Sequence, residues 1–136
     1  MSEKKKILVA DDDDDFRELM YFCLKRDDRF ELLEARDGGQ ALAKAISESP
    51  DLILLDLMMP VMDGFEVASE LTAKLGEGAP KILIITGRNL VEEDAAILLS
   101  GATGIMRKPV ETEVLIKNVD AVLSGGTLDA DWSAIQ

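Results

Sequence analysis

The sequence has no histidine and a single cysteine, Cys23. Common zinc sites need histidine or several cysteines, and Ser-His-Asp triads and Cys-His pairs need an imidazole base. The chain therefore cannot build these sites from its own residues. Cys23 falls on an apolar helical stripe, which predicts a packed core thiol. Any chemistry must rely on carboxylates, lysine, hydroxyls and a hard cation.

Basic residues are also scarce, because 15 lysines and arginines stand against 27 acids and the formal net charge is -12. Nucleic-acid binding and attraction to anionic membranes both depend on lysine and arginine. We therefore expect neither a nucleic-acid partner nor a membrane partner. The charged start, Met1 to Lys6, is followed at once by a strand-length apolar run, so no signal peptide or membrane anchor is expected. The predicted location is the cytoplasm.

Hydrophobic residues make up 47% of the 136 residues, which is enough for one core. Strand and helix patterns alternate along the chain. Strands are expected at 6–10, 30–35, 52–55, 81–86 and 104–107. Helices are expected at about 13–27, 39–47, 65–75, 91–100 and 112–124. This alternation predicts an α/β fold, a doubly wound five-stranded parallel sheet with five helices and right-handed crossovers.

The strand at 52–55 is an unbroken apolar run, which is typical of a central parallel strand buried on both faces. Asp56 follows at its carboxyl end, and Pro60 and Asp63-Gly64 indicate a loop and turn beyond it. Ligands of open α/β sheets bind outside the carboxyl ends of the strands. An aspartate buried there must be paired, bound to metal or used chemically, because its unpaired burial is costly.

Other polar residues follow the remaining apolar strands: Asp11 and Asp12 the first, Thr86 the fourth and Lys108 the fifth. The topology brings these strand ends together. Carboxylates in contact range repel one another, so a positive charge is needed, and oxygen-only ligands favour Mg²⁺. Lys108 supplies a second positive charge. A metal, a lysine and a hydroxyl around one carboxylate nucleophile are the parts needed to stabilise a transferring phosphoryl group.

These residues resemble the receiver domain of two-component response regulators, of the chemotaxis-regulator type. The resemblance is carried by Ile-Leu-Val-Ala-Asp-Asp-Asp at 7–13, Asp-Leu-Met-Met-Pro-Val-Met-Asp-Gly at 56–64, Thr86-Gly87 and Lys108-Pro109. It extends over about 5–124 and implies a flavodoxin-like fold for that receiver domain. Residues 125–136 are then a C-terminal tail or linker stub.

The resemblance implies that Asp56 is the phosphoacceptor for a phosphohistidine in a sensor histidine kinase or a histidine phosphotransfer protein. It implies a Mg²⁺ site made by Asp11, Asp12, Asp56 and the main-chain carbonyl of Met58. Thr86 would bond one phosphoryl oxygen in the activated state, and Lys108 would pair with another. The output would be altered contact with a downstream protein whose identity is unknown. Such a module is no enzyme beyond self-phosphorylation from phosphodonors and autodephosphorylation.

Simpler roles are open to each of these residues taken alone. Asp11 and Asp12 suit the start of a helix, Thr86 a strand end, and Lys108 a solvated surface. A haloacid-dehalogenase-like phosphohydrolase also forms an aspartyl-phosphate, but it needs an aspartate two residues after the nucleophile, where this chain has Met58. No cap segment for substrate specificity is visible either. The signalling module is therefore favoured over the phosphohydrolase.

Two features depart from a plain receiver pattern. Many receivers carry an aromatic residue or histidine three positions before the lysine, where this chain has Ile105, so the usual aromatic readout of phosphorylation is in doubt. The helix at 91–100 and the strand at 104–107 would still form the output face, with the shape change carried by the helix or by the loop at 87–90. The tail holds the only tryptophan, Trp132, which is expected to dock on its own domain or on a neighbouring molecule. A solvated linker is the alternative.

Overall fold

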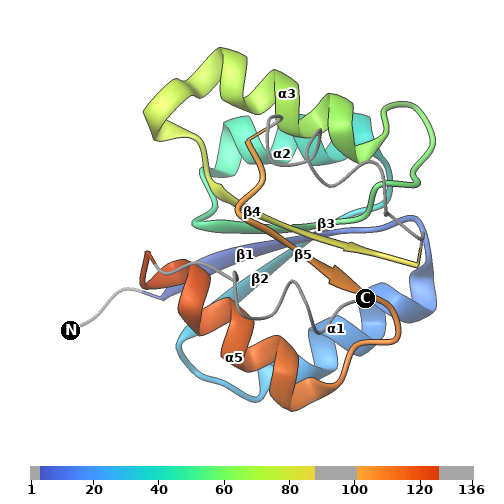
Figure 1. The fold of residues 1–136 in the computed structure, drawn as a ribbon, viewed down its shortest axis with the longest axis vertical. Helices are drawn as coiled ribbons and strands as arrows, with labels where there is room; N and C mark the ends of the chain where they lie inside the picture. The colour runs from blue at the N-terminus through green and yellow to red at the C-terminus, as the bar shows by residue number, and fades with distance from the viewer. Residues whose placement is uncertain (1–3, 88–100, 126–136) are drawn as a thin grey trace.

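The chain forms a parallel sheet of five strands with helices on both faces (Figure 1). The computed structural model describes residues 4–87 and 101–125. The sheet order is β2-β1-β3-β4-β5. The strands are β1 (Lys5–Ala10), β2 (Phe30–Ala35), β3 (Leu52–Leu55), β4 (Lys81–Thr86) and β5 (Gly104–Arg107). The helices are α1 (Asp14–Lys25), α2 (Gly38–Glu48), α3 (Gly64–Leu75), the short 3-10 helix η1 (Gly76–Gly78) and α5 (Thr112–Leu123).

These elements confirm the predicted α/β class, the five strands and their parallel arrangement. The helix bounds differ from the predicted ones by one or two residues, the largest difference being the end of α1 at Lys25. The predicted helix at 91–100, the loop residues 88–90 and Trp132 lie outside the described residues. None of the helices in the described segments is long and apolar enough to cross a bilayer.

The core is divided by the sheet into two layers. Figure 1 shows α2 and α3 on one face and α1 and α5 on the other. Alternate residues of a strand point to opposite faces, so Leu8 joins the cluster on the α2 and α3 side while Ile7 joins the cluster on the α1 and α5 side. All four residues of β3 are buried, as expected for a strand covered on both faces.

Aspartates that follow the strands also begin the helices. Asp13 caps α1 by accepting hydrogen bonds from the main-chain N–H groups of Asp15 and Phe16. Asp37 caps α2, and Asp63 caps α3, each through a main-chain N–H in the first turn. Such caps satisfy N–H groups that have no partner within the helix. Several acids near the carboxyl edge of the sheet are therefore explained by helix starts.

Residue 105, where the sequence departs from the receiver pattern, lies in the core. Ile105 pairs with Ile84 of β4 in the sheet register and is 1% exposed. It belongs to the apolar cluster on the α2 and α3 side of the sheet. An aliphatic side chain at this position fills the core, and it offers no polar tip that could reach solvent.

Gly38 is required where α2 meets the loop between β3 and α3. A Cβ at this position would lie 1.9 Å from the main-chain oxygen of Met62, and the Gly38 N–H donates to the Pro60 oxygen at 3.3 Å. Backbone atoms cannot turn aside as a side chain does. Gly38→Ala is therefore expected to lower the free energy of unfolding by about 1–3 kcal/mol, measured by urea denaturation.

Gly78→Ala is the matched control, because nothing lies within 4 Å of a Cβ at that position. It should leave the free energy of unfolding within about 0.5 kcal/mol of the wild-type value. Equal stability of the Gly38 and Gly78 variants would show that the loop between β3 and α3 can move to accommodate a Cβ at position 38 at little energetic cost.

Candidate functional site

The pairing of β1 with β3 places two carboxylates side by side at the carboxyl edge of the sheet. Ala10 and Leu55, the last residues of these strands, are register partners. Asp11 and Asp56 come next, and the Asp56 N–H donates to the Ala10 oxygen at 3.0 Å. The backbone therefore keeps its sheet pairing up to the acids, which fixes where both side chains begin.

Asp12 completes a group of three acids. One carboxylate oxygen from each of Asp11, Asp12 and Asp56 lies within 4.8 Å of the other two. Asp11 and Asp56 are buried, whereas Asp12 is exposed. Carboxylate oxygens are hard ligands of the kind that Mg²⁺ takes while keeping several waters. This donor set fits a single hard cation with one side open to solvent.

Lys108 brings a positive charge to the same place. Its Nζ lies 2.8 Å from Asp11 Oδ2 and 3.8 Å from Asp56 Oδ2. Its N–H donates to the oxygen of Thr86 at 2.9 Å, so the chain after β5 is still tied to the end of β4. The ammonium offsets part of the negative charge of the buried pair.

The environment of Asp56 raises the pKa of its carboxyl to about 6. Burial is the largest cause, because it disfavours the charged form, and the neighbouring charge of Asp11 is the second. Lys108, the Met58 N–H and the Thr86 hydroxyl act in the opposite direction, by charge or by hydrogen bonds to the carboxylate. A carboxylate held in this way is stabilised by any additional cation that binds beside it.

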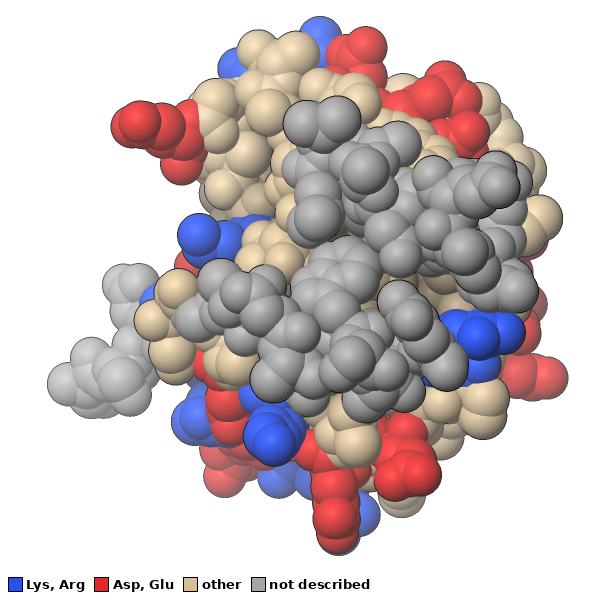
Figure 2. Space-filling view, viewed as in Figure 1, with Lys and Arg blue, Asp and Glu red and all other residues tan. Residues whose placement is uncertain are grey.

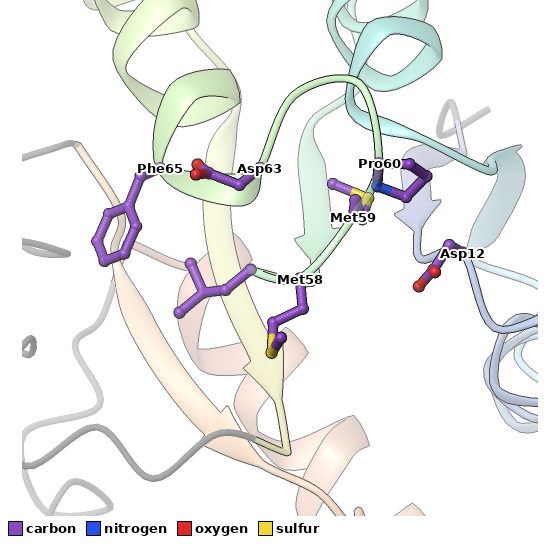
Figure 3. A pocket seen from close by; sticks show the side chains of 7 residues that line it. Asp12, Met58, Met59, Pro60, Asp63 and Phe65 are labelled. Carbon is purple, nitrogen blue, oxygen red and sulfur yellow. The ribbon is translucent and has the colours of Figure 1, made fainter.

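Met58 follows the strand by two residues and contacts the site through its backbone. Its N–H donates to Asp56 Oδ1 at 3.3 Å, while its side chain is 60% exposed. Figure 3 shows this side chain in the lining of a pocket of about 500 Å³, to which Asp12 also contributes. The lining residues are Asp12, Leu57, Met58, Met59, Pro60, Asp63 and Phe65. The hollow therefore opens beside the acidic group.

The structure thus brings all of the sequence-predicted side chains to one edge of the sheet. Thr86 is the last residue of β4 and is 1% exposed, and its hydroxyl lowers the pKa of the Asp56 carboxyl. The role of the Met58 carbonyl as a metal ligand stays a prediction.

On the face shown in Figure 2, acidic and basic side chains are interspersed over the described surface.

Arg17 was missed by sequence reasoning. Its guanidinium is almost fully buried, and Nη1 donates to the main-chain oxygen of Asp11 at 2.8 Å. It also pairs with Asp14 and, at 3.4 Å, with Glu34 of β2. The signal in the sequence was its spacing, since Arg17 precedes the buried Met20 by three residues and so occupies a core-facing position.

Phe16 lies in the first turn of α1, and its partly buried ring packs against the core cluster on the α1 and α5 side of the sheet. The same ring also lies beneath Lys108, with Nζ 4.1 Å from the ring centroid. No sequence pattern links these two positions, because the contact joins the first turn of α1 to the loop after β5.

Comparison with known proteins agrees with this arrangement. The family model of the response regulator receiver domain matches residues 7–120. The chain is 34% identical to Protein PilH of Pseudomonas aeruginosa over 95 residues, which is 70% of this chain and 78% of that protein. It is 37% identical to Response regulator MprA of Mycobacterium ulcerans, covering 95% of this chain and 54% of that protein. The chain thus spans about half of MprA.

Solved structures give the same result. The signal receiver domain of the putative response regulator NarL from Mycobacterium tuberculosis superposes with a TM-score of 0.84 at 30% identity, covering 91% of this chain and 99% of that one. Chemotaxis response regulator CheY4 of Vibrio cholerae superposes with a TM-score of 0.79 at 34% identity, covering 88% and 98%. Together with the motifs at the strand ends, these matches establish that the chain belongs to the response regulator receiver domain family of two-component signalling.

Proposed function

We propose that Asp56 is the phosphoacceptor of this receiver domain and takes its phosphoryl group from a phosphohistidine in a sensor histidine kinase or a histidine phosphotransfer protein. The observation that carries the proposal is the position of Asp56. It is buried at the end of the central strand, within 3.8 Å of the Lys108 ammonium and beside two further acids. Asp11 has similar neighbours, but it follows β1, whereas Asp56 is the acid of this group that follows the central strand β3.

In the proposed reaction a carboxylate oxygen of Asp56 attacks phosphorus, and the bond from phosphorus to the donor nitrogen breaks. The phosphoryl group ends as an acyl phosphate on Asp56, and the imidazole leaves and regains a proton from solvent. Lys108 releases Asp11 to pair with one phosphoryl oxygen, and the Thr86 hydroxyl bonds another. Both groups act by stabilising negative charge on the transferred group.

The proposal includes Mg²⁺ held by Asp11, Asp12, Asp56 and the main-chain carbonyl of Met58. When bound, the ion neutralises charge on the phosphoryl oxygens and on the carboxylates. Both carboxylate oxygens of Asp11 have protein partners that hold the side chain in place, since Oδ1 accepts the Asp13 N–H at 2.9 Å and Oδ2 lies 2.8 Å from Lys108 Nζ. The open side at Asp12 leaves room for water ligands and for the donor.

Phosphorylation would then change the contacts of the domain with a downstream protein. The chain's own chemistry would be limited to self-phosphorylation from small donors and to hydrolysis of the acyl phosphate. A phosphohydrolase of the haloacid-dehalogenase type is not proposed, because the exposed thioether of Met58 occupies the place of its second aspartate.

A mapping experiment tests the phosphoacceptor assignment. The protein is incubated with acetyl phosphate in Mg²⁺ or in EDTA. Intact mass counts the phosphoryl groups, and reduction of the acyl phosphate to homoserine then marks the modified aspartate for peptide mass spectrometry. We expect one phosphoryl group per chain, on the peptide that contains Asp56, and only with Mg²⁺. An adduct on a different aspartate, or equal labelling in EDTA, would overturn the assignment.

Asp12→Ala tests the metal site separately. Removing one of three carboxylate ligands is expected to weaken Mg²⁺ binding by about tenfold or more, measured by calorimetric titration. Saturating Mg²⁺ should raise the melting temperature of the wild type by mass action and that of the variant much less. Asp15→Ala is the control, because it removes the same charge from an exposed position in the first turn of α1. Equal Mg²⁺ affinity of the two variants would contradict the ligand set.

A further inference from the structure

The Lys108 ammonium is enclosed by three groups of different chemistry. Asp11 Oδ2 lies 2.8 Å from Nζ, Asp56 Oδ2 lies 3.8 Å away, and the centre of the Phe16 ring lies 4.1 Å away. The lysine side chain is 23% exposed. Two neighbours are therefore carboxylates that take part in the site, and the third is a ring that the reaction itself does not use.

The start of the helix that carries the ring is tied to one of the site acids, Asp11. Asp13 donates its N–H to Asp11 Oδ1 at 2.9 Å, and its own Oδ1 accepts the Phe16 N–H at 3.3 Å. Asp11 holds Lys108 through its other carboxylate oxygen. These contacts close a circuit from Asp11 through Asp13 and Phe16 to Lys108 and back to Asp11. The backbone that carries the ring is therefore tied to Asp11, and the ring itself packs against the core cluster on the α1 and α5 side.

An aromatic face attracts an ammonium through its quadrupole, and the attraction is stronger where the cation is partly removed from water. Unlike a third carboxylate, the ring adds no charge to an already acidic site. An aliphatic side chain of similar size would exclude water without attracting the charge. The ring thus restricts the flexible lysine side chain. Because the ring is uncharged, it does not form an ion pair that would hold the ammonium away from the phosphoryl group.

We propose that Phe16 is a positioning residue for phosphoryl transfer, and that its ring keeps the Lys108 ammonium beside Asp56, within reach of the phosphoryl oxygen whose negative charge it stabilises. The inference rests on the proposed function, in which Lys108 leaves Asp11 for a phosphoryl oxygen. With the ring present, that step is a short shift between neighbouring oxygens. Without the ring, the stem turns toward water in part of the population, and that part transfers slowly.

The test compares two variants at position 16. Phe16→Leu removes the ring and is expected to slow labelling by acetyl phosphate, at saturating Mg²⁺, by about two- to tenfold. Phe16→Tyr keeps the ring and should stay within about twofold of the wild-type rate. Mg²⁺ affinity should change little in either variant, because the proposed oxygen ligands are intact. If the leucine variant folds poorly, Phe16→Met serves as the variant without a ring.

Tyr21→Leu is the matched control on the same helix. It removes a lysine-aromatic contact far from the acids, where Lys25 Nζ lies 5.4 Å from the Tyr21 ring centroid. Its labelling rate should equal that of the wild type. A rate for Phe16→Leu equal to that of Tyr21→Leu would overturn the positioning role, and so would a Phe16→Tyr variant as slow as Phe16→Leu.

A second measurement does not depend on phosphorylation. In wild-type protein the Lys108 Hε protons should resonate upfield because of the Phe16 ring current, and in Phe16→Leu they should move to the position of an exposed lysine. An unchanged Lys108 signal would sink the inference even if the domain is phosphorylated normally. If wild-type Asp56 took no label while the shift was present, the proposed function would fail and the lysine-ring contact would stand.

Discussion

Asp56→Asn is expected to take up no phosphoryl group from acetyl phosphate under conditions in which the wild type is labelled to completion. An amide is a poor nucleophile for phosphorus, and it carries no negative charge to share with a metal. The substitution is nearly isosteric, and the amide oxygen can still accept the N–H of Met58, which lies 3.3 Å from the carboxylate in the wild type. The loss therefore reports chemistry and not unfolding.

Asp15→Asn controls for the loss of one negative charge near the site, since Asp15 is exposed and lies outside the acidic group. It should be labelled like the wild type. Intact-mass spectrometry at several time points measures both variants. Substantial labelling of Asp56→Asn would mean that another carboxylate accepts the phosphoryl group. The assignment of roles at the carboxyl edge of the sheet would then be wrong.

The second large effect is on stability. In EDTA, Asp56→Asn is expected to be more stable than the wild type at neutral pH by about 2–3 kcal/mol. The Asp56 carboxyl has a pKa of about 6 in the folded protein against an ordinary value of 3.8. Between these values the folded state binds more protons than the unfolded state, so wild-type stability falls as the pH rises through this window. Above pH 6 or so, Asp56 is charged in both states, and the wild type is destabilised by the full free energy of burying that charge.

Urea denaturation of both proteins between pH 4 and pH 8 measures the difference. The two stabilities should converge toward pH 4 and separate as the pH rises, because the asparagine does not titrate in this range. Mg²⁺ should narrow the gap at neutral pH by stabilising the wild-type carboxylate. Parallel curves over the whole range would contradict the raised pKa of Asp56.

The sequence carried enough information to place the polar residues of the site. Asp11, Asp56 and Lys108 each follow a short apolar run. Because parallel strands present their carboxyl ends on one edge of a sheet, the hydrophobic pattern along the chain was enough to predict that these residues meet. Helix starts were also readable, because Asp13, Asp37 and Asp63 precede amphipathic segments at cap positions.

The sequence could not predict which side chains of different elements touch, or how strongly each contact affects the pKa values and packing of the site. Repulsion among the acids was anticipated, whereas burial is the larger cause of the raised pKa of Asp56. The contact of Phe16 with Lys108 and the close approach of Gly38 to Met62 depend on how helices and loops pack, to within an ångström or so. The same holds for Arg17, whose burial is possible only because a carbonyl and two acids surround it.

The sheet order gives the ion pair of Lys108 with Asp11 a further meaning. Lys108 follows β5 and Asp11 follows β1, and three strand spacings, about 14 Å, separate these strands. A four-carbon stem does not span that width alone, so the chain after β5 must turn inward across β4, where the Lys108 N–H meets the Thr86 oxygen. The 2.8 Å distance between Lys108 Nζ and Asp11 Oδ2 therefore depends on the spacing of the strands between β1 and β5. Any change that spreads β3 from β4 would lengthen it without touching either charged residue.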